Sequence, residues 1–253
     1  MDTRRLLSYV RRAVDDYEMI NEGDRICVGI SGGKDSLALL AGLANLRYFY
    51  PKKFELVALT VDMGFDGVDF SEIEALCREL NVPYHVKKTE IAQIIFDIRK
   101  EKNPCSLCAK MRRGVLHSTA KELGCNKIAF GHHFDDVVET FMLNLFHEGR
   151  IGCFQPVTYL SRADITLIRP LVYMPEKDVR YFANRENLPV VKSPCPADGH
   201  TEREETKKLL DTLERQHKGL RHRIFGAIQR GEVDGFKILE RLPEGEKDGE
   251  DMG

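Results

Sequence analysis

Tryptophan is absent from the 253-residue chain, and aromatic side chains make up only 8% of it. The sequence also lacks any run near the roughly 18 apolar residues that a membrane-spanning helix requires. Its first residues, MDTRRLLSYVRR, contain no apolar core of signal-peptide length. These absences argue against an aromatic-rich RNA-binding module and against a membrane protein. We therefore expect a soluble, cytoplasmic protein.

A strong charge of one sign is lacking too, since the formal net charge is −2 at pH 7. Cysteine occurs seven times, an odd number. Without an export signal the thiols are expected to stay reduced, so metal binding or catalysis is favoured over a disulfide framework. We predict that four cysteines are ordinary buried apolar side chains: Cys27, Cys77, Cys125 and Cys153. The other three lie in patterns that indicate chemistry: Cys105, Cys108 and Cys195.

The sequence does contain short apolar runs that alternate with segments of helical apolar spacing. The predicted strands cover residues 25–30, 54–62, 83–90, 126–133 and 166–171. The predicted helices cover residues 2–20, 37–46, 71–81, 135–146, 175–187 and 201–230. We expect Pro175 to be the first residue of its helix, and Ser71 with Glu74 to form a capping box. This alternation predicts an α/β, Rossmann-like fold, a parallel sheet with helices on both faces.

The same pattern divides the chain into four segments. We predict an N-terminal amphipathic helix with a basic outer side over residues 1–22 and a main domain over residues 23–200. A helical C-terminal extension is expected over residues 201–242, and a disordered acidic tail over residues 243–253. In a parallel α/β sheet, ligands bind at the carboxyl ends of the strands, so the site is expected there.

A glycine loop joins the first predicted strand to the helix after it. Glycine lets backbone N–H groups converge on an anion, and the amino end of a helix is electropositive. The loop is not a Walker A motif, because Val28 stands where that motif has its first glycine and Asp35 where it has Ser or Thr. It is not GxGxxG either. We expect it to bind phosphate through Ser31, Gly32, Gly33, Lys34, Asp35 and Ser36.

The loop sequence SGGKDS resembles the pyrophosphate-binding loop of the N-type ATP pyrophosphatases, the PP-loop superfamily. Other motifs make the chain similar to the tRNA 2-thiocytidine synthetases (the TtcA-like family): NPCSLCAKMRRGVL at 103–116, KIAFGHHFDDVVET at 127–140, IRPL at 168–171, and the lone Cys195. The resemblance implies an adenine nucleotide alpha hydrolase-like sheet. It also implies that residues 23–200 form a PP-loop ATP pyrophosphatase domain with a CxxC insertion, which cleaves ATP between its α and β phosphates.

The CxxC motif, Cys105 and Cys108, presents two thiolates on one helical turn, which fits zinc, an iron–sulfur cluster or a redox pair. Cys195 stands between two prolines, which keep its segment extended. Three cysteines leave one iron of a [4Fe–4S] cluster open for a sulfide. The alternatives are structural zinc completed by His200 and a catalytic persulfide. The resemblance favours the cluster, although the family commonly has a second CxxC where this chain has Asp198.

Two carboxylates, Asp135 and Asp136, follow a predicted strand and a glycine, where a nucleotide should lie. Mg²⁺ on a triphosphate takes one or two carboxylates. Helix capping is the structural alternative. The resemblance implies that Asp136 assists adenylation and that Gly131 lets the nucleotide approach closely. We expect Asp62, at the end of the second strand, to meet the ribose or the metal, or else to form a turn.

A basic cluster follows the CxxC motif within two helical turns: Lys110, Arg112 and Arg113. Its positive field lowers thiolate pKa values and stabilises the charge that builds up on the α phosphate. Arg112 or Lys110 is therefore the expected electrostatic catalyst. A solvated basic helix face is the alternative.

The resemblance implies an ATP-dependent tRNA sulfurtransferase that adenylates a base carbonyl, C2 of an anticodon-loop cytidine, and replaces it with sulfur. The expected cofactors are ATP, Mg²⁺ and a [4Fe–4S] cluster. The expected partners are tRNA and a sulfur donor, either a cysteine desulfurase or sulfide, with a homodimer left open. We expect RNA phosphates at the N-terminal arginines and at Arg150, Lys207, Lys208, Arg215, Lys218, Arg221 and Arg223. An enzyme that thiolates or amidates a small metabolite, and a non-catalytic metal-binding protein, are the alternatives.

Overall fold

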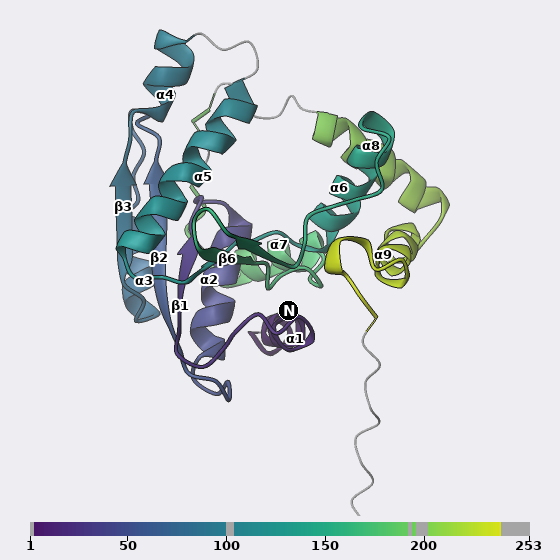
Figure 1. Cartoon of the computed structure of the whole chain (residues 1–253), viewed down its shortest axis with the longest axis horizontal. Helices are drawn as coiled ribbons and strands as arrows, with labels where there is room; N and C mark the ends of the chain where they lie inside the picture. The colour runs from purple at the N-terminus through teal and green to yellow at the C-terminus, as the bar shows by residue number, and fades with distance from the viewer. Residues whose placement is uncertain (1–2, 100–103, 192–193, 196–201, 239–253) are drawn as a thin grey trace, which may run out of the picture.

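A computed structural model of the chain describes residues 3–99, 104–191, 194–195 and 202–238 (Figure 1). The expected acidic tail, His200 and Asp198 lie outside these residues. No helix in the described part of the chain is both long and apolar enough to cross a membrane.

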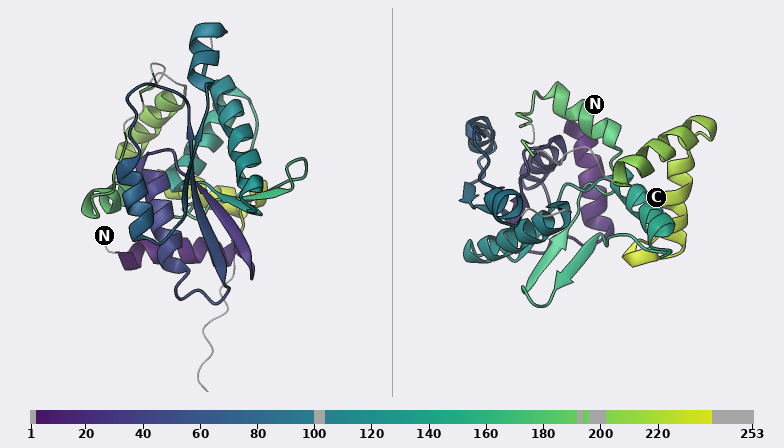
Figure 2. Two further views of the ribbon diagram at one scale, coloured as in Figure 1. Left: turned by 90° about the vertical axis from the view of Figure 1, so that its left-hand side faces the viewer. Right: turned by 90° about the horizontal axis from the view of Figure 1, so that it is seen from above.

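One six-stranded sheet organises the molecule, with the strand order β3-β2-β1-β4-β6-β5. Its strands are β1 (Asp24–Gly29), β2 (Phe54–Asp62), β3 (Tyr84–Lys88), β4 (Lys127–Ala129), β5 (Val157–Leu160) and β6 (Ile165–Ile168). Every predicted strand is present. The sheet is parallel except for β5, which pairs antiparallel with β6 and which the sequence analysis missed. The β5–β6 hairpin extends away from the helices (Figure 2). Its strand β5 has only four residues, none of them buried, so it lacks the apolar run that marked the others.

Helices cover both faces of the sheet (Figure 2). They are α1 (Thr3–Asp16), α2 (Lys34–Leu46), α3 (Ser71–Glu79), α4 (Ile91–Gln93) with the π-helical turn η1 (Ile94–Ile98), α5 (Pro104–Glu122), α6 (Phe134–His147), α7 (Glu176–Arg185), α8 (Glu202–Gln216), α9 (Leu220–Arg230) and the 3₁₀ turn η2 (Val233–Gly235). The single helix expected over residues 201–230 is two helices, because Gly219 adopts a left-handed φ of +80° and turns the chain between them.

Two helix starts differ from the prediction. The capping box of Ser71 with Glu74 is wrong: Ser71 is already helical, and both its N–H and its hydroxyl donate to the Asp69 carboxylate. An aspartate two residues upstream therefore satisfies the helix start. Pro175 is the residue that precedes α7 rather than its first residue.

The central strands are apolar on both faces, and each face belongs to a different core. In β1, Ile26 and Val28 face the main core with α1, α2 and α7, whereas Cys27 faces a second core with Leu116 and Ala120 of α5. This alternation follows from the two-residue period of a strand. Of the four cysteines expected to be buried, Cys27, Cys77 and Cys125 are buried, and Cys153 is only partly so.

The C-terminal helices belong to the main core. Leu210, Phe225, Ile228 and Phe236 are all buried in it, and the Phe225 ring lies 4.8 Å from the Phe134 ring at the start of α6. Figure 1 shows α8 and α9 beside α6. The charged side chains of these two helices are therefore held close to the carboxyl edge of the sheet.

A buried ion pair joins the amino ends of two central strands. Lys127 Nζ at the start of β4 lies 2.6 Å from Asp24 Oδ2 at the start of β1, and it also donates to the Met19 carbonyl. The Asp24 carboxylate accepts from the Asn21 N–H and from Asn126 Nδ2 as well. Both charged side chains are at least nine-tenths buried. A buried charge needs such complete pairing, so the contact fixes β1 against β4.

We expect Lys127→Met to lower the free energy of unfolding by about 3–5 kcal/mol, because it leaves the Asp24 carboxylate buried without a cation. The double variant Lys127→Met, Asp24→Asn should recover at least half of that loss. Urea denaturation at pH 7 measures both. Lys121→Met is the matched control, since it breaks the exposed pair with Asp164 and should change stability by less than about 1 kcal/mol. Strictly additive losses in the double variant would contradict this account.

Candidate functional site

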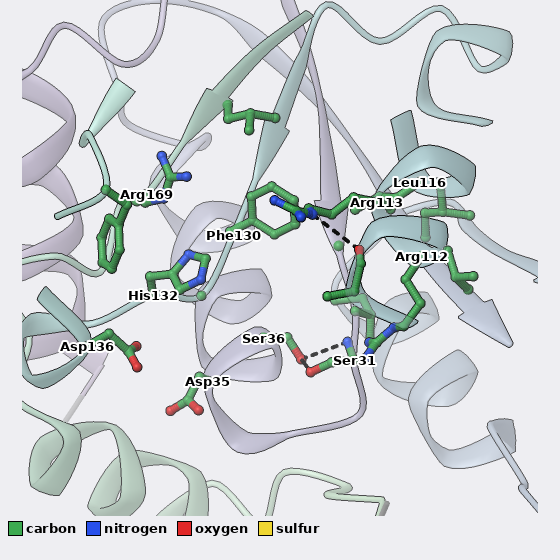
Figure 3. A pocket seen from close by; sticks show the side chains of 18 residues that line it. Ser31, Asp35, Ser36, Arg112, Arg113, Leu116, Phe130, His132, Asp136 and Arg169 are labelled. Atoms are coloured by element: carbon green, nitrogen blue, oxygen red, sulfur yellow. Dashed lines mark hydrogen bonds between the residues drawn. The ribbon is translucent and has the colours of Figure 1, made fainter. Parts of the chain in front are cut away.

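The principal cavity lies at the carboxyl ends of the central strands, where the fold predicted a ligand, and has a volume of about 660 Å³. The glycine loop, the turn between β4 and α6, helix α5 and the end of β6 supply its walls (Figure 3). That volume is in the range of pockets that bind small molecules. A smaller cavity adjoins it and shares Ser31 and Arg112 with it.

The glycine loop is held by its own serines. Ser36 Oγ donates to the Gly33 carbonyl at 2.9 Å and accepts from the Ser31 N–H at 3.2 Å. Gly32 has a φ of +83°, and Gly33 immediately precedes α2 without any side-chain cap. The first N–H groups of α2 therefore point to the loop without a side-chain acceptor, which is the arrangement that binds phosphate.

Lys34 is not among the residues that line the cavity, whereas Ser31, Asp35 and Ser36 are. Its Nζ lies 3.1 Å from Asp35 Oδ1 and 3.2 Å from Glu176 Oε1 at the start of α7. Glu176 also pairs with Lys207 of α8 at 2.8 Å. Burial alone would raise the pKa of Glu176, but the Lys207 hydrogen bond and the Lys34 charge outweigh burial and lower the pKa to about 2. A chain of charges thus links the loop to the C-terminal helices.

Gly131 brings the β4–α6 turn against the glycine loop. A Cβ at this position would lie 2.8 Å from the carbonyl carbon of Asp35 and 3.0 Å from the Ser36 nitrogen. Gly131 also lines the cavity. Because Gly131 has no side chain, the turn can contact the loop backbone. The sequence analysis had instead expected Gly131 to let the nucleotide approach closely.

Two carboxylates face the cavity, but they are not the adjacent pair that the sequence suggested. Asp35 and Asp136 line it, one in the first turn of α2 and the other in the first turn of α6 (Figure 3). The His133 ring lies between them, with Nε2 3.8 Å from Asp35 Oδ1 and Nδ1 3.4 Å from Asp136 Oδ2. Asp35 Oδ1 is enclosed, and it lies close to two nitrogens, Lys34 Nζ at 3.1 Å and His133 Nε2 at 3.8 Å. Such an oxygen is suited to a hard cation.

Asp136 also has the structural role considered for it. Its Oδ2 accepts from the His133 N–H at 2.8 Å, and its own N–H donates to His133 Nδ1, which completes a capping box for α6. Its Oδ1 lies 3.4 Å from Arg203 Nη2 of α8. The Asp136 side chain therefore both caps α6 and lines the cavity.

Asp135 and Asp62 lie outside the principal cavity. The Asp135 carboxylate accepts from the Glu176 N–H at 2.6 Å and pairs with Arg221 at 3.2 Å. Asp62 Oδ1 accepts from the Gly64 N–H at 3.0 Å, as a turn former does, and lines the smaller cavity.

Helix α5 supplies the basic wall opposite the carboxylates. Arg112 and Arg113 line the principal cavity (Figure 3), whereas Lys110 is exposed and does not. Arg112 also interacts with the Cys108 thiol of the same helix. Of the two expected electrostatic catalysts, only Arg112 is placed where it faces a ligand.

The three singled-out cysteines lie near one another. Cys108 is partly buried and its Sγ lies 3.5 Å from the Met63 sulfur. Burial raises the pKa of the Cys108 thiol; the charge of Arg112 opposes that rise, and Cys195 and Cys105 add to it. Within the described residues, no group of three or more His, Cys, Asp or Glu side chains is arranged to hold a single metal ion. Thiolates on different irons of a cluster need not converge on one point.

The cavity wall includes polar and aromatic residues that did not enter the predicted site, among them Phe130, His132, Phe154 and Arg169. His132 and Arg169 stand in the motifs GHH and IRPL, which marked the family. No local pattern indicated that Phe154 would lie beside them.

Several basic residues expected at RNA phosphates have partners within the protein. Arg221 is buried and pairs with Asp135, Glu139 and Asp211, and Lys207 pairs with Glu176. The hypothesis that these two contact RNA is therefore not supported. Both stabilise the acidic groups behind the cavity instead.

The comparisons with known proteins agree on one family. A sequence profile of the PP-loop domain matches residues 5–211. The tRNA-cytidine(32) 2-sulfurtransferase of Geobacter sulfurreducens is 40% identical over 228 residues, 89% of this chain and 89% of the relative. The enzyme of the same name from Syntrophotalea carbinolica is 40% identical over 240 residues, which cover 94% of this chain and 92% of the relative. The U34-tRNA thiolase NcsA from Methanococcus maripaludis, solved with its [4Fe–4S] cluster, superposes with a TM-score of 0.73 at 26% identity, over 90% of this chain and 79% of that one.

We expect Glu176→Gln to lower the free energy of unfolding by up to about 3 kcal/mol at pH 7, from the shift of the Glu176 pKa to about 2. A lowered pKa stabilises the fold above pH 4.5 and loses that effect as the pH falls towards 2. The difference between wild type and variant should therefore shrink across that window in urea titrations. Glu186→Gln, at an exposed carboxylate beside α7, is the control and should change stability by less than about 0.5 kcal/mol. A difference independent of pH would contradict the expectation.

Proposed function

The chain belongs to the PP-loop domain family, as the SGGKDS loop predicted, and from this premise we propose that it is an ATP-dependent tRNA sulfurtransferase. Its substrate is a cytidine of the anticodon loop, at position 32 as in the names of its relatives. The C2 carbonyl oxygen of the base attacks the α phosphorus of ATP, and pyrophosphate leaves as the new O–P bond forms. Sulfide then adds at C2 with loss of its proton, the C2–O bond breaks, and AMP leaves.

The observation that carries this proposal is the double position of Arg112. Its side chain lines the cavity beside Ser31 of the glycine loop, and it also interacts with Cys108. The Arg112 side chain thus lies between the phosphate-binding loop and the Cys108 thiol. A base activated at the loop is then within reach of sulfur delivered at the cysteines, and positioning of this kind removes much of the barrier to transfer.

The glycine loop holds the departing pyrophosphate in this proposal. Backbone N–H groups at the start of α2 bind the phosphate oxygens, while Ser31 and Ser36 fix the loop through their mutual hydrogen bonds. Arg112 and Arg113 face the loop from α5 and stabilise the charge that grows on the α phosphate. Lys34 acts from behind the loop, where Glu176 holds it.

Mg²⁺ fits the carboxylate pair of Asp35 and Asp136. Both carboxylates line the cavity and offer the hard oxygen ligands that Mg²⁺ prefers, which supports this. When bound there, Mg²⁺ draws negative charge from the phosphate oxygens. His133 keeps the two carboxylates apart, and Arg203 restrains Asp136 from the outer side.

A [4Fe–4S] cluster fits the three thiols Cys105, Cys108 and Cys195. Their mutual influence on the pKa of Cys108 supports a common site, and the nearby Arg112 favours the thiolate form that binds iron. Such a cluster, when bound, leaves one iron open for the sulfur that a desulfurase or sulfide supplies. Met63, whose sulfur contacts the Cys108 thiol, and Pro194 line the neighbouring cavity.

The decisive experiment incubates anaerobically purified protein with a tRNA transcript, ATP, Mg²⁺ and sulfide, and then analyses nucleosides and nucleotides by mass spectrometry. We expect 2-thiocytidine together with AMP and pyrophosphate, and iron near four atoms per chain. Cys105→Ala, Cys108→Ala and Cys195→Ala should each lose both iron and thiolation. Cys77→Ala, at a buried thiol of α3, is the control and should lose only stability. ADP and phosphate as products, or a thiolated uridine, would overturn the proposal.

We expect Asp136→Asn to reduce AMP formation by more than tenfold, because the amide keeps the capping oxygen but binds Mg²⁺ poorly. The neighbouring Asp135→Asn is the matched control. It breaks the pair with Arg221, so it should lower the melting temperature while losing less activity than Asp136→Asn. Equal turnover in wild type and Asp136→Asn would limit Asp136 to its capping role.

A further inference from the structure

One wall of the principal cavity is aromatic and cationic, and the proposed chemistry does not use it. Phe130 and His132 follow β4, Phe154 precedes β5, and Arg169 follows β6. The His132 ring lies 4.9 Å from the Phe154 ring and 5.8 Å from the Phe130 ring. Arg169 and His132 face the cavity from the side opposite Arg112, and Phe130 lies between them and Arg113 (Figure 3). Aromatic walls of this kind stack unpaired bases of RNA.

Arg169 is a buried cation without a carboxylate. Its side chain belongs to a residue that is only 8% exposed, yet none of the described Asp or Glu side chains forms an ion pair with it. Its guanidinium lies 5.0 Å above the Phe154 ring, and its Nη1 donates to the Gln155 carbonyl and to Thr158 Oγ1. Burial lowers the pKa of Arg169 to about 10, so it remains charged at neutral pH. A buried charge without a counterion is costly, and it persists where a ligand uses it.

The other edge of the Arg169 guanidinium is unused within the described residues. Its Nε is enclosed without a hydrogen-bond partner, and Nη2 makes no hydrogen bond to the protein there either. Nη2 is therefore the Arg169 donor that remains for an acceptor of a ligand in the cavity. An arginine has only donors, so this edge rejects a ligand that offers an N–H.

His132 adds a second donor beside Arg169. Burial lowers the pKa of His132 to about 4, so the ring is neutral and one nitrogen carries the proton. Nδ1 is enclosed without a partner. An enclosed N–H without an acceptor is rarer than an enclosed lone pair without a donor, so we assign the proton to Nε2. These side chains therefore offer hydrogen-bond donors and stacking surfaces, and the nearby Asp136 carboxylate opposes the fall in the pKa of His132.

We propose that Arg169 and His132 form a cytosine-selective subsite in which their N–H groups meet N3 and O2 of the base that is modified; this rests on the proposed function. In cytosine N3 and O2 are neighbouring acceptors, whereas N3 of uracil carries a hydrogen that meets the donors of Arg169. O2 uses the lone pair on its N3 side and keeps the other for the α phosphorus. Phe154 and the His132 ring supply the stacking surface. Cytosine therefore accepts hydrogen bonds from the subsite, whereas uracil places its N3–H against the donors of the protein.

The test is a double-mutant cycle that combines a change at one substrate atom, N3 of the base, with a change of one side chain, Arg169. Transcripts carry cytidine or 3-deazacytidine, in which C–H replaces N3, at the modified position. Wild type and Arg169→Met are compared by kcat/KM for pyrophosphate release, which accompanies adenylation itself and requires neither sulfide nor a cluster. We expect 3-deazacytidine to reduce the wild-type value by about 10- to 100-fold, the usual effect of a lost hydrogen bond to a charged group. Arg169→Met should lose a similar factor on cytidine and less than threefold more on 3-deazacytidine.

Controls separate the subsite from a structural role. The KM for ATP should change less than threefold in Arg169→Met, and Arg78→Met, at an exposed arginine of α3, should leave both constants unchanged. His132→Phe keeps the ring contacts and should also lose activity on cytidine, so the test does not depend on one variant folding. The wild-type comparison of the two transcripts needs no variant at all.

Three outcomes would overturn the proposal. If the losses caused by Arg169→Met and by 3-deazacytidine multiply when the two changes are combined, Arg169 does not contact N3. A raised KM for ATP, with discrimination between transcripts retained, means that the wall binds adenine instead. If wild type releases no pyrophosphate with the cytidine transcript, the proposed function fails and the subsite fails with it. The first two leave the proposed function intact, so the failures are distinguishable.

Discussion

The backbone contact between Gly131 and Asp35–Ser36 determines the geometry of the whole site. Because no side chain stands at Gly131, the turn after β4 lies directly on the loop after β1. The first turns of α2 and α6 therefore meet at one point, and each contributes an electropositive helix end and one carboxylate. Anions and a cation that bridges them can both be bound there. A rigid contact between two backbones holds this arrangement more closely than side-chain packing alone.

Acidic groups concentrated at two helix starts require compensation from elsewhere in the chain. Arg203, Lys207 and Arg221 supply it from α8 and α9, and each pairs with carboxylates of α6 or α7. Burial raises the pKa of Glu139, which lies among them, and the three cations oppose that rise. The basic stretch of the C-terminal segment thus serves the interior of the protein. Its exposed lysines, such as Lys208 and Lys218, are the ones that remain available to a polyanion.

Local signals in the sequence predicted the elements, the family and the position of the site, because each rests on neighbouring residues. Strands β1 and β2 are buried on both faces and so appear as apolar runs, and the glycine loop is complete in six residues. Pairings across the chain were not predictable in this way. Lys34 was expected at the phosphates and instead contacts Glu176, and Asp135 was expected beside Asp136 and instead contacts Arg221. Adjacent residues on a helix point in different directions, so sequence neighbours need not share a site.

The dependence of the carboxylates on α8 and α9 has a consequence for biosynthesis. Those helices leave the ribosome after the sheet and the glycine loop have been made. Until then Glu139 and Asp136 lack Arg203 and Arg221, and the Phe134 ring lacks the cover of Phe225. A nascent chain with every strand in place therefore still has an open, uncompensated site, and the active geometry is acquired only once α8 and α9 have been made.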